Sequence, residues 1–305
     1  MTSHDILGLG CVAVDDLFYV PAYPAPDTKV RVESSERQCG GLTATALVAA
    51  SRLGARCAYA GTLGDDDLSR FVLERLQEED IDTTLVRRRP RTRPIHSCVI
   101  VDQSSQTRTI LYDLDGVQPA MPDWPPDDAV RTSGMLFIDH FGAEGMIRAG
   151  RLAHAAGRPI VADLESDQTP RFAELLALSD HLIVSLEFGC RLTGAADPAA
   201  AIERLWSAAR AVVVLTCGAQ GCWYRAPGHE RPHHQPAFRV AAVDTTGCGD
   251  VFHGAYAAAL VQGLLLPERI RFATAAAALK ATQRGGQAGI PRRPAVEAFL
   301  KERPS

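Results

Sequence analysis

Four apolar runs follow residue 131, and each is separated from the next by a stretch of helical character: GMLFID, PIVADLE, HLIVSLE and AVVVLTCG. Strands that are apolar at nearly every position are typical of parallel sheets with helices on both faces. Ligands bind such open sheets outside the carboxyl ends of the strands. The polar residues and glycines at those ends are therefore the first candidates for a functional site: Asp15, Asp163, Glu165, Glu187, Thr216, Gly218 and Asp250.

Two extended segments depart from this alternation of strand and helix. Residues 17–38 contain Pro21, Pro24 and Pro26, which suit turns and edge strands and exclude a central helix. Residues 94–115 have the pattern of a hairpin, with IHSCVIVD and TILYD on either side of a polar turn. We expect both segments to form a small sheet beside the main body, within one domain that spans residues 1–305.

Composition excludes several classes of protein. The 36 acids and 32 bases leave a formal charge of -4, and the arginine-rich residues 87–93 predict a solvated turn rather than a nucleic-acid groove. No apolar run approaches the roughly 18 residues that a membrane span needs, and the N-terminus lacks the pattern of a signal peptide. The eight cysteines include no Cys-x-x-Cys pair, which argues against a disulfide framework. We expect a cytoplasmic protein that binds neither nucleic acid nor membrane.

The run VDTTGCGDVFHGA, residues 243–255, places two glycines and an acid between a strand and an alanine-rich helix. Gly247 and Gly249 leave their amides unobstructed, and the helix N-terminus favours an anion at the same spot. Asp250 has two interpretations: it caps the helix, or it accepts the proton of a hydroxyl that attacks a phosphoryl group. Cys248 is either an oxidisable thiol, because a helix N-terminus can lower a thiol pKa, or a small inert filler.

This run resembles the C-terminal signature of the PfkB, or ribokinase-like, family of sugar kinases, whose common form is D-T-x-G-A-G-D before a helix of small residues. Upstream, CGGLTATALVAASRLGARCAYAGTLGDD resembles the family's glycine pair, helix and Gly-Asp-Asp stretch. The two extended segments resemble its lid. The resemblance covers nearly the whole chain and implies a three-layer α/β/α sandwich with a mostly parallel central sheet and a small β-sheet lid. Within the family, the chain is most similar to the fructokinase, ketohexokinase and sulfofructose kinase relatives.

The resemblance implies a role for each matching residue. Asp250 would be the catalytic base, beside an anion hole built from Gly247, Cys248 and Gly249. The nucleotide would lie along Thr216, Gly218, Gly221 and Thr246. The substrate-binding candidates, some from the glycine pair and others from the lid, are Asp15, Lys29, Gly40, Gly41, Thr45, Arg108 and Tyr112. The resemblance also implies ATP and Mg2+ as cofactors, leaves a monovalent cation such as K+ open, and implies a homodimer formed through the lid.

Departures from the family pattern bear on metal and substrate. SLEF stands in place of the family's Asn-x-x-Glu motif, which leaves Glu187 and Asp163, with Glu165 as a further candidate, as possible metal ligands. Thr45 replaces the usual Asn, and a hydroxyl cannot bridge two sugar hydroxyls as an amide does. Lys29 matches a sulfonate ligand of sulfofructose kinases, whereas Tyr112 and Phe141 replace the others.

We therefore expect phosphorylation of a primary hydroxyl of a small sugar, such as a neutral ketose. Three alternatives stay open. The chain could be a sulfofructose kinase, a nucleoside kinase on the same scaffold, or a non-catalytic protein that senses a sugar or nucleotide.

Overall fold

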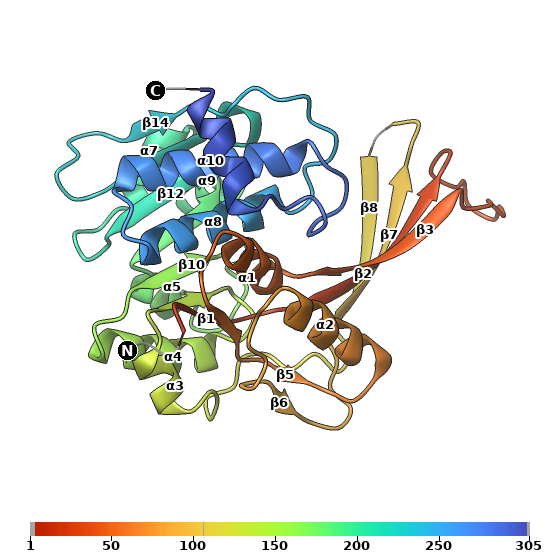
Figure 1. Ribbon diagram of the computed structural model, residues 1–305, viewed down its shortest axis with the longest axis horizontal. Helices are drawn as coiled ribbons and strands as arrows, with labels where there is room; N and C mark the ends of the chain where they lie inside the picture. Colours follow the sequence, from red (N-terminus) through yellow and green to blue (C-terminus); the bar gives the residue numbers. More distant parts are fainter. Residues whose placement is uncertain (1–3, 106, 304–305) are drawn as a thin grey trace.

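The computed structural model describes residues 4–105 and 107–303, and its largest element is an eight-stranded sheet (Figure 1). Six strands run parallel, in the spatial order β12-β11-β10-β9-β1-β4, and two antiparallel strands, β13 and β14, extend one edge. The parallel strands are β1 (Ile6–Leu9), β4 (Cys57–Tyr59), β9 (Met135–Ile138), β10 (Ile160–Asp163), β11 (His181–Ser185) and β12 (Val212–Thr216). The antiparallel pair is β13 (Cys222–Arg225) and β14 (His233–Gln235).

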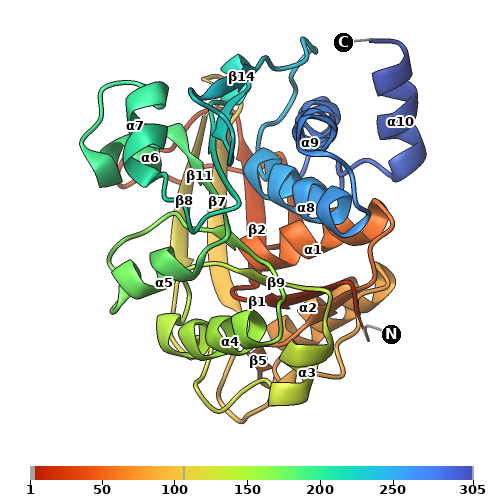
Figure 2. The same ribbon diagram turned by 90° about the vertical axis from the view of Figure 1, so that its left-hand side faces the viewer.

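The four apolar runs form β9 to β12, and their side chains are buried on both faces of this sheet. Neighbouring positions such as Met135 and Leu136 belong to two different hydrophobic clusters, because successive strand residues point to opposite faces. One cluster is covered by α1 (Leu42–Arg52), α2 (Asp67–Glu78), α8 (Cys248–Val261), α9 (Leu266–Ala281) and α10 (Arg293–Lys301). The other is covered by α3 (Asp127–Thr132), α4 (Ala143–Ala155), α5 (Phe172–Leu178), α6 (Leu186–Thr193) and α7 (Pro198–Leu205). Figure 2 shows these two layers on opposite sides of the strands.

A second sheet of four strands projects from the side of this body (Figure 1). Its order is β3-β2-β7-β8, formed by β2 (Ala13–Val20), β3 (Ser34–Gly40), β7 (Ile95–Asp102) and β8 (Thr107–Asp113). Strands β2 and β7 are parallel, with Ala13 opposite Ile95, and the other two pairings are antiparallel. The predicted fold class, a mostly parallel helix-covered sheet with a small second sheet, is confirmed.

The apolar run DILGLGCVAV, residues 5–14, predicts a single strand, and this prediction is wrong. In the structure the run divides into β1 and β2, which belong to different sheets. The break lies at Gly10, where an added Cβ would stand 2.1 Å from Thr43 Oγ1, and at Cys11, whose N–H donates to Asp139 Oδ2 (2.7 Å). A side-chain acceptor therefore takes the backbone donor that a ladder would have used.

The smaller elements are a two-stranded ribbon, β5 (Thr62–Leu63) with β6 (Arg87–Arg88), and a 3-10 turn at Gly218–Gln220. Across the described residues, no helix combines the length and apolarity that a membrane crossing requires.

Candidate active site

A cavity of about 390 Å³ opens where the two sheets meet, at the carboxyl ends of the central strands. Its walls come from the turn after β1, the start of α1, the start of β7, the ends of β9 and β10, and the first turn of α8. The lining residues are Cys11, Gly41, Leu42, Ile95, His140, Phe141, Glu165, Ser166 and Asp250. Sequence segments from the whole length of the chain thus converge on one small site, as expected for an open parallel sheet.

Asp250 enters this cavity from the first turn of α8. The helix begins after Gly247, whose left-handed backbone (φ 75°, ψ 4°) leads into Cys248, and no side chain caps it. The capping interpretation of Asp250 is therefore wrong, and its carboxylate is left to face the cavity.

The first turn of α8 also supplies unused backbone donors. Val251 N makes the first helical bond, to Gly247 O at 2.9 Å, so the N–H groups of Gly249 and Asp250 precede the helical ladder. Cys248 N donates instead to Thr245 O (3.2 Å). The donors left for an anion are thus those at positions 249 and 250 rather than at 248, and Gly249 is open enough for close approach, with nothing within 4 Å of an added Cβ.

The loop that precedes α8 is anchored by Asp244 and by the end of α9. Asp244 Oδ1 accepts from Thr246 N (2.8 Å), and Oδ2 accepts from Gly285 N (2.9 Å). The backbone N–H groups of Val243 and Asp244 both donate to Ala281 O, at 2.7 and 3.1 Å. Four hydrogen bonds therefore fix the path of the chain into Gly247.

Carboxylates crowd around Asp250. Burial raises the pKa of Asp250 well above its usual value, and the negative charges of Asp163 and Glu165 raise it further. Glu165 lines the cavity, where the loss of surrounding water likewise raises its pKa. A raised pKa brings the pKa of the carboxyl group closer to that of a hydroxyl. The ionised carboxylate is then a stronger base.

His253 lies one turn after Asp250 and joins α8 to the end of the sheet. Its Nδ1 is 2.8 Å from Gly249 O, and its Nε2 is 3.0 Å from Ile183 O. Nδ1 also lies 3.4 Å from Asp163 Oδ2, a buried oxygen that has no hydrogen-bond partner among the described residues. His253 therefore positions the first turn of α8. Sequence reasoning missed this residue, for which the one available signal was its spacing of three residues from Asp250.

Asp139 is a second residue that sequence reasoning missed, although it ends an apolar strand just as Asp163 does. It is fully buried. Oδ2 accepts from Cys11 N (2.7 Å) and Thr43 Oγ1 (2.8 Å), and Oδ1 accepts from Phe141 N (2.7 Å). Asp139 thus ties together three of the segments that form the cavity walls.

The glycine pair lies at the start of α1, beside the cavity. Gly41 lines it and has φ +94°; an added Cβ would stand 2.7 Å from Val12 Cα, so only glycine fits. Gly40 leaves room for Asp15, whose Oδ2 would be 2.3 Å from an added Cβ. Burial raises the pKa of Asp15, and a hydrogen bond from Ser97 opposes the shift.

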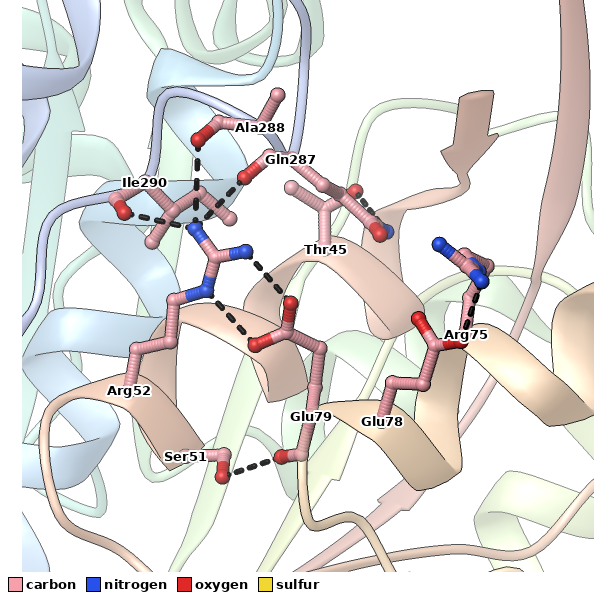
Figure 3. Close-up of polar contacts among 9 residues, drawn as sticks. All are labelled: Thr45, Ser51, Arg52, Arg75, Glu78, Glu79, Gln287, Ala288 and Ile290. Atoms are coloured by element: carbon pink, nitrogen blue, oxygen red, sulfur yellow. Dashed lines mark hydrogen bonds and ion pairs between the residues drawn. The ribbon is translucent and has the colours of Figure 1, made fainter. Parts of the chain in front are cut away.

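Of the seven predicted substrate residues, Gly41 alone lines the cavity; Asp15 and Gly40 are not among the lining residues, and neither are the other four. Thr45 is buried on α1, and its Oγ1 accepts from Gln287 Nε2 at 3.2 Å (Figure 3). Lys29 is exposed in the segment between β2 and β3, while Arg108 and Tyr112 are exposed on β8. Among the described residues of the second sheet, Ile95, at the inner end of β7, is the one that lines the cavity.

Three of the four predicted nucleotide residues lie at a tight turn after β12, and the fourth, Thr246, lies in the loop before α8. Thr216 ends the strand, Gly218 and Gly221 have φ of +54° and +92°, and Cys217 N donates to Gly221 O (2.7 Å). Glu187 is exposed in the first turn of α6. Within residues 4–105 and 107–303, no three or more His, Cys, Asp or Glu side chains are grouped to hold a metal ion by themselves.

Known proteins with similar sequences and structures identify the family of this chain. Residues 8–293 match the pfkB family carbohydrate kinase. Ribokinase of Haemophilus influenzae is 28% identical over 307 residues, with 96% of this chain and 97% of that protein covered. Ketohexokinase of Mus musculus is 26% identical, with 93% and 98% covered. The solved structure of Arabidopsis thaliana ribokinase, complexed with ribose and ATP, gives a TM-score of 0.84 at 25% identity and covers 99% of each chain.

These matches confirm the predicted family, and ribokinases and ketohexokinase stand at similar distances from the chain. The family match spans nearly all of the sequence, and a relative of the same fold has been solved with ATP. The chain belongs to the PfkB family of carbohydrate kinases.

Proposed function

We propose that this kinase transfers the γ-phosphoryl group of ATP to a primary hydroxyl of a small neutral sugar. The observation that carries the proposal is the position of Asp250, which lines the cavity within the same helical turn that presents the free amides. The hydroxyl proton passes to Asp250 while the hydroxyl oxygen attacks the γ-phosphorus. The bond to the leaving ADP oxygen then breaks, and the amides of the first turn stabilise the charge on the transferred group.

The character of the cavity walls supports a neutral acceptor. They include two carboxylates, Glu165 and Asp250, and no lysine or arginine. The free amides of α8 are assigned to the transferred phosphoryl group, so no lysine or arginine of the wall remains to bind an anionic sugar. Leu42, Ile95 and Phe141 offer apolar surface for the C–H faces of a sugar ring. Lys29 lies outside the walls, which weighs against a sulfonated sugar.

The nucleotide is proposed to lie along Thr216, Gly218 and Gly221 and to reach Asp250 past Thr246. Mg2+ would bridge its phosphates largely through water. The unpartnered, buried Oδ2 of Asp163 and the open carboxylate of Glu165 are acceptors that suit a hydrated cation, with Glu187 as a more distant candidate at the end of the neighbouring strand. When bound, Mg2+ supplies charge neutralisation on the phosphates.

The second sheet is proposed to act as the lid of a single domain spanning residues 1–305. Closure over the sugar would exclude water and suppress ATP hydrolysis. A homodimer through this sheet is also proposed, because Ile110, Leu111 and Tyr112 on β8 are 49%, 56% and 67% exposed. Successive strand residues point to opposite faces, so exposed apolar side chains lie on both faces of this part of β8. Leu111→Asp is expected to yield a monomer by light scattering.

A cytoplasmic location is proposed as well. All eight cysteines are free thiols, as a reducing compartment requires.

The acceptor class can be tested by measuring ADP release with ketoses, aldoses, nucleosides, sulfofructose and sugar phosphates. Turnover of a neutral sugar is expected. Preference for a nucleoside or for sulfofructose would select one of those alternatives, and no turnover with any acceptor would favour a sensing protein.

The base is tested by Asp250→Asn, for which we expect a loss of roughly 100-fold or more in kcat. Asp128→Asn, an exposed acid on α3, is the matched control and should leave kcat unchanged. Near-normal turnover by Asp250→Asn would reject the assignment.

A further inference from the structure

Lys280 is a fully buried lysine that contacts the loop leading into α8. It lies in the last turn of α9, and its relative exposure is 0%. Its Nζ donates a hydrogen bond to the backbone oxygen of Asp244 at 2.9 Å. A buried ammonium group is stable only when oxygen atoms or negative charges lie close to it. The groups around Nζ therefore indicate the role of its positive charge.

Those surroundings are the loop that leads into α8. Asp244 is the residue whose carboxylate holds Thr246 N and Gly285 N. The residue after Lys280, Ala281, accepts the two backbone N–H groups of Val243 and Asp244. Lys280 and Ala281 therefore hold the carbonyl and amide sides of the same peptide segment, three residues before Gly247.

The charge of Lys280 balances the acids of this region. Burial lowers the pKa of Lys280, the carboxylates of Asp244 and Asp250 oppose that shift, and the positive charge of Arg108 adds to it. Burial would raise the pKa of Asp244, but hydrogen bonds from Thr246 and the charge of Lys280 bring it below its usual value. The carbonyl end of α9 also favours a cation. An ammonium beside an ionised Asp244 is consistent with all of these influences.

We propose that Lys280 is a built-in cation for phosphoryl transfer, so that this enzyme does not depend on K+ or another monovalent cation. The inference rests on the proposed function. A monovalent cation would assist an anion hole by adding positive charge near it, where backbone oxygens could hold the cation. Lys280 already meets both conditions, because it holds Asp244 O and lies within electrostatic range of Asp250. A second cation at the same oxygen would be repelled by the ammonium.

Lys280 is thus a positioning residue, since it contacts the loop and not the reacting atoms. The first test assays the wild-type enzyme with tetramethylammonium as the only monovalent cation and then adds K+. We expect no change beyond the general effect of ionic strength. Strong activation by K+ would overturn the inference.

The second test compares two substitutions at the same position. Lys280→Met keeps the length of the side chain without its charge, and we expect a loss of roughly 100-fold in kcat that K+ does not reverse. Lys280→Ala leaves a cavity against Asp244 O, and its kcat should fall by a similar factor. Because the cavity can admit a small cation, K+, ammonium or methylammonium should raise the kcat of this variant at least about tenfold. Lys301→Ala, at the exposed end of α10, is the control without effect.

A purely structural role would lower the thermal midpoint of both variants without rescue of Lys280→Ala by small cations. That outcome, or wild-type kcat in Lys280→Met, would overturn the inference. If wild type turns over no acceptor, the proposed function fails separately. The affinity for a non-hydrolysable ATP analogue then remains as a readout: weakened binding to Lys280→Ala that K+ restores supports the inference, and unchanged binding rejects it.

Discussion

Arg52 and Glu79 form a two-point ion pair that joins the end of α1 to the end of α2. Arg52 Nε donates to Oε2 at 2.7 Å and Nη2 to Oε1 at 2.5 Å (Figure 3). The remaining nitrogen, Nη1, donates to the backbone oxygens of Gln287 (3.0 Å) and Ile290 (2.8 Å). The Gln287 side chain in turn donates to Thr45. One guanidinium therefore fixes two helices and the loop that follows α9.

Arg52→Met should destabilise the protein by about 3 kcal/mol, because the side chains of Arg52 and Glu79 are only 15% and 19% exposed and the substitution leaves Glu79 and loop carbonyls unpaired. Arg75 and Glu78 provide a matched control on α2 (Figure 3), since that ion pair is 45% and 54% exposed. Arg75→Met should cost less than about 1 kcal/mol. Urea unfolding measures both, and equal costs would show that the contacts of Arg52 to the loop add nothing.

Asp250→Asn should stabilise the fold at neutral pH while it removes activity. The pKa of Asp250 is raised well above its usual value by burial and neighbouring acids, so between the unfolded and folded pKa values the folded state binds more protons than the unfolded state. Its contribution to stability therefore falls as pH rises through that interval. In thermal unfolding, the midpoint temperature of the variant should exceed that of the wild type above about pH 4. At lower pH the two midpoints should not differ in this way. A gain that is independent of pH would contradict this account.

Glu165→Gln should move the acidic limb of the kcat/KM profile to lower pH. The negative charge of Glu165 is one of the influences that raise the pKa of Asp250, and its removal allows the base to ionise at lower pH. Profiles of the two enzymes over the same pH range provide the measurement. Asp167→Asn, whose carboxylate pairs with Arg191 at 2.9 Å, should leave the limb in place.

Gly249→Ala should separate catalysis from folding. An added Cβ at Gly249 meets nothing within 4 Å, so the helix should gain about 0.5–1 kcal/mol from the better helix former, while kcat falls because the methyl group obstructs the amides. Gly254→Ala is the opposite case in the same helix. Its Cβ would stand 2.1 Å from Ala46 O on α1, and overpacking should cost at least about 1–3 kcal/mol. Loss of stability in Gly249→Ala would remove the argument for close approach at this residue.

Cys248→Ala should retain most activity and give no added resistance to peroxide. Burial raises the pKa of the Cys248 thiol, and Sγ lies 3.6 Å from Ala277 O, so the thiolate needed for oxidation is disfavoured. This favours the filler interpretation over the oxidisable one. Inactivation of wild type by peroxide that Cys248→Ala prevents would reverse that conclusion.

The fold could be predicted because its strongest signals are local. The apolar runs of β9 to β12 and the helices between them determine a parallel sheet without any knowledge of long-range contacts. The boundary between β1 and β2 could not be predicted, because it depends on Asp139, which lies 128 positions from Cys11 along the chain. A residue so distant leaves no mark in the local pattern of a strand.

The candidate site divides in the same way. Asp250, Gly247 and Gly249 stand out because two glycines precede an acid at the start of a helix, and Gly41 stands out as part of a glycine pair. Asp139, His253 and Lys280 were missed because each sits in a run of apolar or small residues and is recognised only by what it contacts. The hydrogen bond between Thr45 and Gln287 could not be predicted either, because Gln287 lies in a loop 242 positions away along the chain.

The order of elements along the chain has a consequence for protein engineering. Every strand of the second sheet precedes residue 114, whereas Thr216, Asp250 and Lys280 all follow residue 215. A single crossover near residue 120 would therefore exchange the second sheet and the start of α1 between relatives, while Phe141, Glu165 and Asp250 of the cavity wall stay with the second portion. Such a chimera has two junctions to respect, Ala46 against Gly254 and Arg52 against Gln287 to Ile290, since these contacts hold the two portions of the polypeptide together.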